Sequence, residues 1–230
     1  MIRNNEYKKF LNEYIPKSNL LYNDKSNIIY LRVIENLIVT DIFRNYIGEY
    51  EVECYIEFLD DYKIQYTKML LYIGINDYEA VTYCIRGLIE SLLKFIYSIY
   101  IIEQKEDIQK LSFRNIKEDL KEFNSNGLNM NIELIIKLCE IYGKYSNAIH
   151  GKIDNRSSVQ YIAEIIENEN RELINIENIL LDILNIYEDI MIEILEIESL
   201  ATSELIVLKK SINNKRYNKL IQKIINKKEF

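Results

Sequence analysis

The only histidine of the chain, His150, stands in a segment whose residue types could carry acid–base chemistry. That segment reads Tyr142-Gly143-Lys144-Tyr145-Ser146-Asn147-Ala148-Ile149-His150-Gly151. On a helix, Ser146 and Asn147 precede His150 by one turn, so the three polar groups share a face. Histidine titrates near neutral pH without perturbation, which suits it to general acid or base catalysis on a phosphate ester. The alternative is structural, because a histidine at a helix C-terminus caps free carbonyls and gains stability as a cation.

Two charged residues, Arg86 and Glu90, lie one turn apart in the apolar stretch 77–102. They can form an ion pair within the helix. Alternatively, both side chains reach the helix end at His150, where Arg86 would add positive charge. The spacing leaves both interpretations open.

Positive charge gathers late in an otherwise acidic chain. Residues 200–230 carry eight basic and two acidic side chains, although the whole chain has a net charge of −7 and a pI of about 5.1. The acidic total argues against broad, sequence-blind binding of nucleic acid. The basic segment either neutralises an acidic neighbour in the same fold or contacts phosphate, with Lys219 and Lys223 as candidate binding residues.

Most other site chemistries are absent from the sequence. One histidine cannot build a His-rich metal site, and there is no His-Glu-x-x-His, glycine-rich phosphate loop or Cys-x-x-Cys. We therefore expect neither a metal ion nor a cofactor. The widely spaced Cys54, Cys84 and Cys139 should be reduced, ordinary apolar residues.

Tyrosine is abundant, with 19 residues that fall mostly on apolar stripes. There we expect core or interface residues whose hydroxyl groups reach water. Stacking on the bases of single-stranded RNA is the alternative. Beside His150, Tyr145 and Ser146 are candidate binding residues.

The elements that must position these residues are helices. Six glycines and one proline allow few tight turns, so we expect an all-α, multi-helix bundle. Apolar residues recur at helical spacing over residues 4–15, 26–47 (capped by Asp24 or Ser26), 52–73, 77–102, 112–123, 131–149 and 157–198. We expect a break in the last stretch near residues 168–170, and basic helices follow it. Residue types predict helix starts at Asp77, Ser112 and Ser157 and helix ends at Pro16, Gly48, Gly74 and Gly151.

We expect one compact unit with three parts: an N-terminal helical segment (1–75), a central bundle (76–156) and long C-terminal helices with a basic tail (157–230). Stretch 77–102 is apolar on nearly all sides, so it should be the central helix. No uncharged run approaches the roughly 18 residues of a membrane span, and the first residues lack the apolar run of a secretion signal. We expect no membrane association and a cytoplasmic location.

Three stretches form a pattern: residues 77–81, residues 86–94 and residues 145–151, with Leu111-Ser112-Phe113 in the linker between the last two. Together they resemble the HEPN superfamily of helical domains, nearest to the abortive-infection C-terminal type. The resemblance covers roughly residues 76–156 and implies a HEPN-like central bundle that forms a homodimer. Active members are metal-independent ribonucleases with a composite site at the dimer interface, built around an Arg-x4–6-His motif. His150 matches the histidine, and Asn147 matches a polar position inside the motif.

Lys144 stands where that motif has arginine, with five residues between it and His150. Lysine supplies a point charge without the planar fork that grips phosphate through two hydrogen bonds. The resemblance implies an RNase of a defence or toxin system, in which the 2′-hydroxyl of RNA attacks the neighbouring phosphate with help from His150. Lys144 and Arg86 would stabilise the developing charge. The alternative is a non-catalytic helical module that binds a regulatory protein partner in a defence or stress system.

Overall fold

The computed structural model describes residues 6–22, 25–49, 54–101, 104–125, 131–149, 159–160, 163, 173 and 176–226. These residues form ten α-helices and one 3-10 helix, and no strand occurs among them, which confirms the all-α prediction. The elements are α1 (Glu6–Tyr14), η2 (Asn19–Tyr22), α2 (Lys25–Glu49), α3 (Glu57–Gly74), α4 (Tyr78–Tyr100), α5 (Lys105–Lys110), α6 (Phe113–Ser125), α7 (Ile132–Ile149), α10 (Ile176–Ile194), α11 (Thr202–Ser211) and α12 (Asn214–Asn226).

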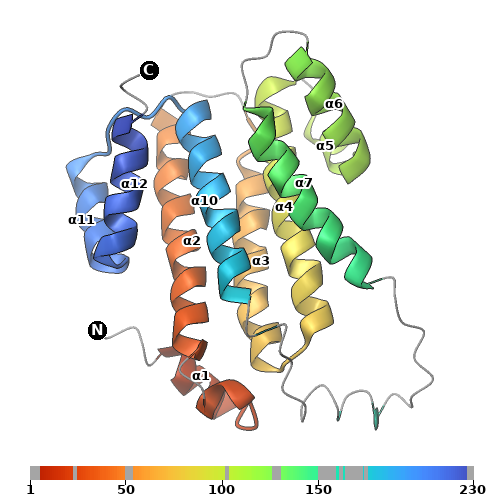
Figure 1. Cartoon of the computed structure of the whole chain (residues 1–230), viewed down its shortest axis with the longest axis vertical. Coiled ribbons are helices and arrows are strands. Elements are labelled where there is room, and N and C mark those ends of the chain that lie inside the picture. The colour runs from red at the N-terminus through yellow and green to blue at the C-terminus, as the bar shows by residue number, and fades with distance from the viewer. Residues whose placement is uncertain are drawn as a thin grey trace.

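Five long helices pack in a closed ring. Following the chain, α2 packs on α3, α3 on α4, α4 on α7 and α7 on α10, and α10 returns to α2 (Figure 1). Tyr46 marks the closure, because its hydroxyl donates to the carbonyl of Ser199 and accepts from the backbone N–H of Ala201, both at 3.0 Å. Shorter helices cover the ring from outside: α1 on α2, α5 and α6 on α4, α11 on α2 and α12 on α10.

Helix α4 is the central element that the apolar pattern predicted. The side chain of Asp77 accepts a hydrogen bond from the backbone N–H of Ala80 at 2.9 Å, which caps the helix as expected. Side chains from nearly all sides of α4 are fully buried: Val81, Ile85, Leu88, Ile89, Leu92, Leu93, Phe95 and Ile96. The core of the bundle is therefore built around this helix.

Several helix bounds agree with the prediction, because local signals set them. Helix α1 ends before Pro16, and the Ser112 hydroxyl caps α6 by accepting from the backbone N–H of Asn115 at 3.2 Å. Helix α7 ends at Ile149, as predicted. The signals at Gly151 and Ser157, and the break expected near residues 168–170, lie outside the described residues.

Two bounds were wrong for tertiary reasons. Helix α3 begins at Glu57 instead of residue 52, and the backbone N–H of Tyr55 donates to the Ser98 hydroxyl of α4 at 3.2 Å instead of joining the helix. The expected polar linker before Ser112 contains the short helix α5, whose Ile108 is fully buried. Contact with α4 stabilises these segments more than their local sequence does.

The glycines Gly74 and Gly143 differ in what surrounds them. A Cβ at Gly74 would lie 2.9 Å from side-chain atoms of both Leu11 and Ile15, so a larger residue there would force these side chains to shift. A Cβ at Gly143, in the interior of α7, would meet no atom within 4 Å, as far as the structure describes the chain.

Gly143→Ala should therefore raise the free energy of unfolding by about 0.5–1 kcal/mol, because alanine restricts the unfolded chain and favours the helix. Gly74→Ala should lower it by about 1 kcal/mol through overpacking against the buried Leu11. Urea denaturation followed by far-UV circular dichroism measures both. A gain in stability for Gly74→Ala would contradict the described packing of α1.

Candidate functional site

Arg86 of α4 lies against α7, two turns before its end. Its Nη2 donates to the hydroxyl of Tyr142 at 3.1 Å, and the guanidinium carbon is 5.1 Å from the centre of the Tyr142 ring. The ring centre of Tyr83, also on α4, is 5.9 Å from the same carbon. From α6, Phe113 stacks on Tyr142 with ring centroids 3.7 Å apart. We call these four residues from three helices the Arg86 cluster.

The Arg86 cluster holds a cation that is only partly satisfied. The Nε atom of Arg86 is buried and has no hydrogen-bond partner among the described residues, whereas the Tyr83 ring is 51% exposed. Cation–π contact with two rings offsets part of the cost of burying the guanidinium. The cluster ties α4 and α6 to α7 and leaves Arg86 with donor capacity for a further acceptor.

The predicted residues on α7 divide between its two sides. Tyr145 is buried, Ser146 is half-buried, and Lys144 is exposed with its Nζ 5.5 Å from the centre of the Tyr145 ring. Tyr142 and Lys144 are two residues apart on α7, so their side chains point in different directions. Arg86, which contacts Tyr142, therefore lies on another side of α7 than the side chain of Lys144. Asn147 belongs to α7, but its side chain and the whole of His150 lie outside the described residues.

Of the two interpretations of Arg86 and Glu90, the ion pair within the helix was wrong, because Glu90 pairs with the residue one turn later instead of one turn earlier. Glu90 pairs with Lys94 at 2.8 Å, and Lys94 also donates to the carbonyl of Gln109 in α5 at 3.0 Å. Arg86 instead turns to Tyr142. Glu90 therefore helps to hold α5 on α4, and it is not part of the Arg86 cluster.

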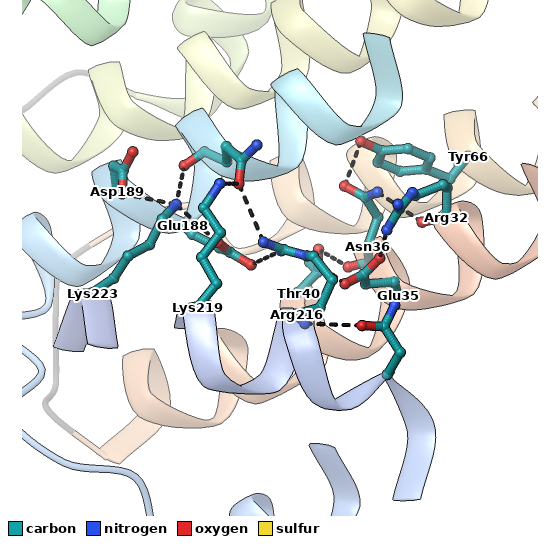
Figure 2. A network of polar contacts seen from close by, with 12 residues as sticks. Arg32, Glu35, Asn36, Thr40, Tyr66, Glu188, Asp189, Arg216, Lys219 and Lys223 are labelled. Atoms are coloured by element: carbon teal, nitrogen blue, oxygen red, sulfur yellow. Dashed lines mark hydrogen bonds and ion pairs between the residues drawn. The ribbon is translucent and has the colours of Figure 1, made fainter. Parts of the chain in front are cut away.

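Three basic residues of α12, Arg216, Lys219 and Lys223, contact carboxylate or amide groups of the same fold (Figure 2). The Nζ of Lys223 lies 2.9 Å from a carboxylate oxygen of Glu188 and 2.9 Å from one of Asp189. It also donates to the carbonyl of Asn185 at 2.9 Å, and Lys219 donates to the side-chain oxygen of Asn185 at 2.8 Å. These contacts favour neutralisation over phosphate binding for Lys223, whereas Lys219 is held by a neutral amide oxygen.

Arg216 is the centre of these contacts, and sequence reasoning missed it. We call the residues Arg216, Lys219 and Lys223 of α12 and their partners on α2 and α10 the α12 network. Its Nε donates to Glu35 of α2 at 2.7 Å, its Nη2 to Glu188 of α10 at 2.5 Å and its Nη1 to Asn185 at 3.2 Å. The signal was available, because Arg216 precedes the buried Leu220 and Ile224 by four and eight residues and so occupies an apolar position of α12.

Burial sets the protonation energetics of the network. It raises the pKa of the fully buried Glu188, and Lys223 and Arg216 offset only part of that rise. Burial lowers the pKa of Arg216, but attraction to Glu188 and Glu35 outweighs it, so the net pKa is raised. Both effects follow from placing charges in a medium where pairing replaces hydration.

The network continues from Glu35 through Arg32 to Asn36 of α2, and Asn36 connects it to Tyr66 of α3. Arg32 pairs with the second oxygen of Glu35 at 2.7 Å, and its carbonyl accepts from the Asn36 side chain at 2.8 Å. The Tyr66 hydroxyl donates to Asn36 at 2.7 Å. A continuous set of polar contacts thus joins α12, α10, α2 and α3 (Figure 2).

Other site chemistries find no support in the described part of the chain. No three His, Cys, Asp or Glu side chains gather there as a set of metal ligands. Cys84 and Cys139 are buried and free, and burial raises the pKa of Cys84 to about 11, so its thiol stays protonated at neutral pH. Of the helices in this part, none has both the length and the apolar character of a membrane-spanning segment.

Comparison of the chain with protein-family models, with curated proteins and with solved structures returned no match.

The candidate site consists of the Arg86 cluster, the exposed Lys144 and the end of α7 that follows them. The α12 network is a separate, structural assembly.

Arg216→Leu should lower the free energy of unfolding by about 3–5 kcal/mol at neutral pH, because Glu188 and Glu35 lose their shared cation while buried. Without Arg216 the pKa of Glu188 should rise further above its usual 4.5, so the native state takes up a proton before the unfolded chain does. The loss should therefore shrink as the pH falls toward about 5. Urea denaturation at both pH values measures this.

The control is Arg114→Leu, which removes a fully exposed partner of Glu118 on α6. It should leave the free energy of unfolding nearly unchanged, because water screens an exposed ion pair. Equal losses for Arg114→Leu and Arg216→Leu would contradict the central role of the α12 network.

Proposed function

We propose that this chain is a metal-independent endoribonuclease of a defence or toxin system, and that it acts at the end of α7. The proposal rests on the HEPN-like pattern of residues 76–156. The observation that supports it best is the packing of α4 against α7, which brings the guanidinium of Arg86 to Tyr142, eight residues before His150. Arg86 thus contacts α7 through Tyr142, and Lys144 projects from another side of the same helix, which leads to the only histidine.

In the proposed reaction His150 accepts the proton of the RNA 2′-hydroxyl as its oxygen attacks the adjacent phosphorus. The attack forms a 2′,3′-cyclic phosphate and breaks the bond to the 5′-oxygen, which must take up a proton. In the expected homodimer a second His150, in its protonated form, supplies that proton. Lys144 and Arg86 stabilise the negative charge that develops on the phosphate oxygens.

His150→Ala should abolish cleavage of total RNA and tRNA in the presence of EDTA, with a loss of about 10²-fold or more. Circular dichroism should show an unchanged helical fold, because alanine is the residue most compatible with a helix. Lys137→Ala is the matched control, since Lys137 is exposed on α7 two turns before Lys144. Retention of full cleavage by His150→Ala would refute the proposed mechanism.

Lys144→Ala should lower the cleavage rate about tenfold or more, because it removes a charge that acts in the transition state. Lys144→Arg should keep or exceed the wild-type rate, since arginine restores the planar donor fork of the motif. Initial rates on one labelled RNA measure both. Equal rates for Lys144→Ala and wild type would exclude Lys144 from the site.

A non-catalytic module that binds a regulatory protein is the second candidate. It is favoured by the α12 network, in which Arg216, Lys219 and Lys223 are occupied by groups of the same chain. Expression in cells separates the two functions. A ribonuclease should arrest growth in a manner that His150→Ala relieves, whereas a binding module should not.

A further inference from the structure

The basic residues of α11 and α12 fall into two sets. Arg216, Lys219 and Lys223 face the carboxylates and amide groups of the α12 network. Lys209, Lys210 and Lys215 are exposed, and none of them forms an ion pair with another described residue. The internal network therefore leaves a second group of positive charges unused.

The second set is compact because α11 and α12 are joined by a short turn. Helix α11 ends at Ser211 and α12 begins at Asn214, so the three lysines surround one turn of the chain. Lys215 is directly followed by Arg216, whose three side-chain contacts anchor this end of α12 to α2 and α10. A rigid element thus presents three like charges to solvent. We call these residues the lysine turn.

The helix dipole stabilises the positive charge of two of these lysines, but it destabilises that of the third. Lys209 and Lys210 stand in the last turn of α11, where a cation is favourable. Lys215 stands in the first turn of α12, where the dipole disfavours a cation. Its charge costs stability within the fold, and an external anion would reverse that cost.

We propose that the lysine turn binds the phosphate backbone of RNA, outside the proposed cleavage site. This inference rests on the proposed ribonuclease function, which supplies the polyanion. Lysine side chains contact phosphates as point charges without reading sequence. The α11–α12 pair and α7 lie on opposite sides of α2 and α10 (Figure 1), so the lysine turn can be altered without touching the end of α7.

The test measures binding of a fluorescently labelled tRNA to full-length protein at several salt concentrations, in the His150→Ala background to prevent cleavage. Replacing Lys209, Lys210 and Lys215 by glutamine should make the slope of log K against log salt shallower by about 2, since each phosphate contact contributes about 0.7. Affinity at low salt should fall about tenfold or more. Lys9, Lys68 and Lys121, exposed on three other helices, replaced together by glutamine form the charge-matched control.

Lys215→Glu separates binding from folding. It should raise the melting temperature, because an acid suits the first turn of α12, and it should weaken tRNA binding. A variant that is more stable but binds less RNA cannot be explained by misfolding.

Equal loss in the two triple variants, or no loss in either, would overturn the lysine turn as an RNA surface. So would equally strong competition by polyglutamate, which would assign the surface to an acidic polypeptide. One outcome is that the His150→Ala protein binds tRNA with a steeper salt dependence than its triple variant at Lys209, Lys210 and Lys215, while wild-type protein cleaves no RNA. That result would refute the ribonuclease function and support the RNA-binding surface. If the His150→Ala protein binds no RNA, both fail.

Discussion

The contact of Arg216 with Glu188 and Glu35 is the constraint on which the position of α12 against α2 and α10 depends. It lies where the ring of helices closes, between the early helix α2 and the late helix α10. A buried carboxylate without a partner is far more costly than an exposed one, so only a position of α12 that serves both acids is acceptable.

Local signals carried much of the fold prediction. Asp77, Ser112 and Pro16 act on the backbone within a few residues, and their effects are the same in a peptide as in the folded chain. The apolar pattern of α4 was equally informative, because a helix that is apolar on nearly all sides has to be surrounded. Helix α5 escaped prediction because one buried residue, Ile108, and a lysine from another helix stabilise it.

The candidate site was less predictable than the fold, since its contacts join distant parts of the chain. Spacing on α4 could pair Glu90 with either Arg86 or Lys94, and only the position of Tyr142 decides between them. Lys219 and Lys223 read as a surface charge cluster in the sequence, because Glu188 and Asp189 are some thirty residues away. Charged residues at apolar positions of a helical pattern, such as Arg216, were the overlooked evidence.

The closure of the ring also orders the events of synthesis. Tyr46 finds its partner at Ser199, 153 residues later, so α2 leaves the ribosome long before the segment that covers it. Until α12 emerges, Glu35 lacks its contact with Arg216, and the growing chain can hold only the helices from α2 to α7 together. Closing a loop of this length costs conformational entropy before its contacts form, so such contacts form slowly. The nascent chain therefore completes its ring only after α10 has emerged, which delays any activity that needs the assembled bundle.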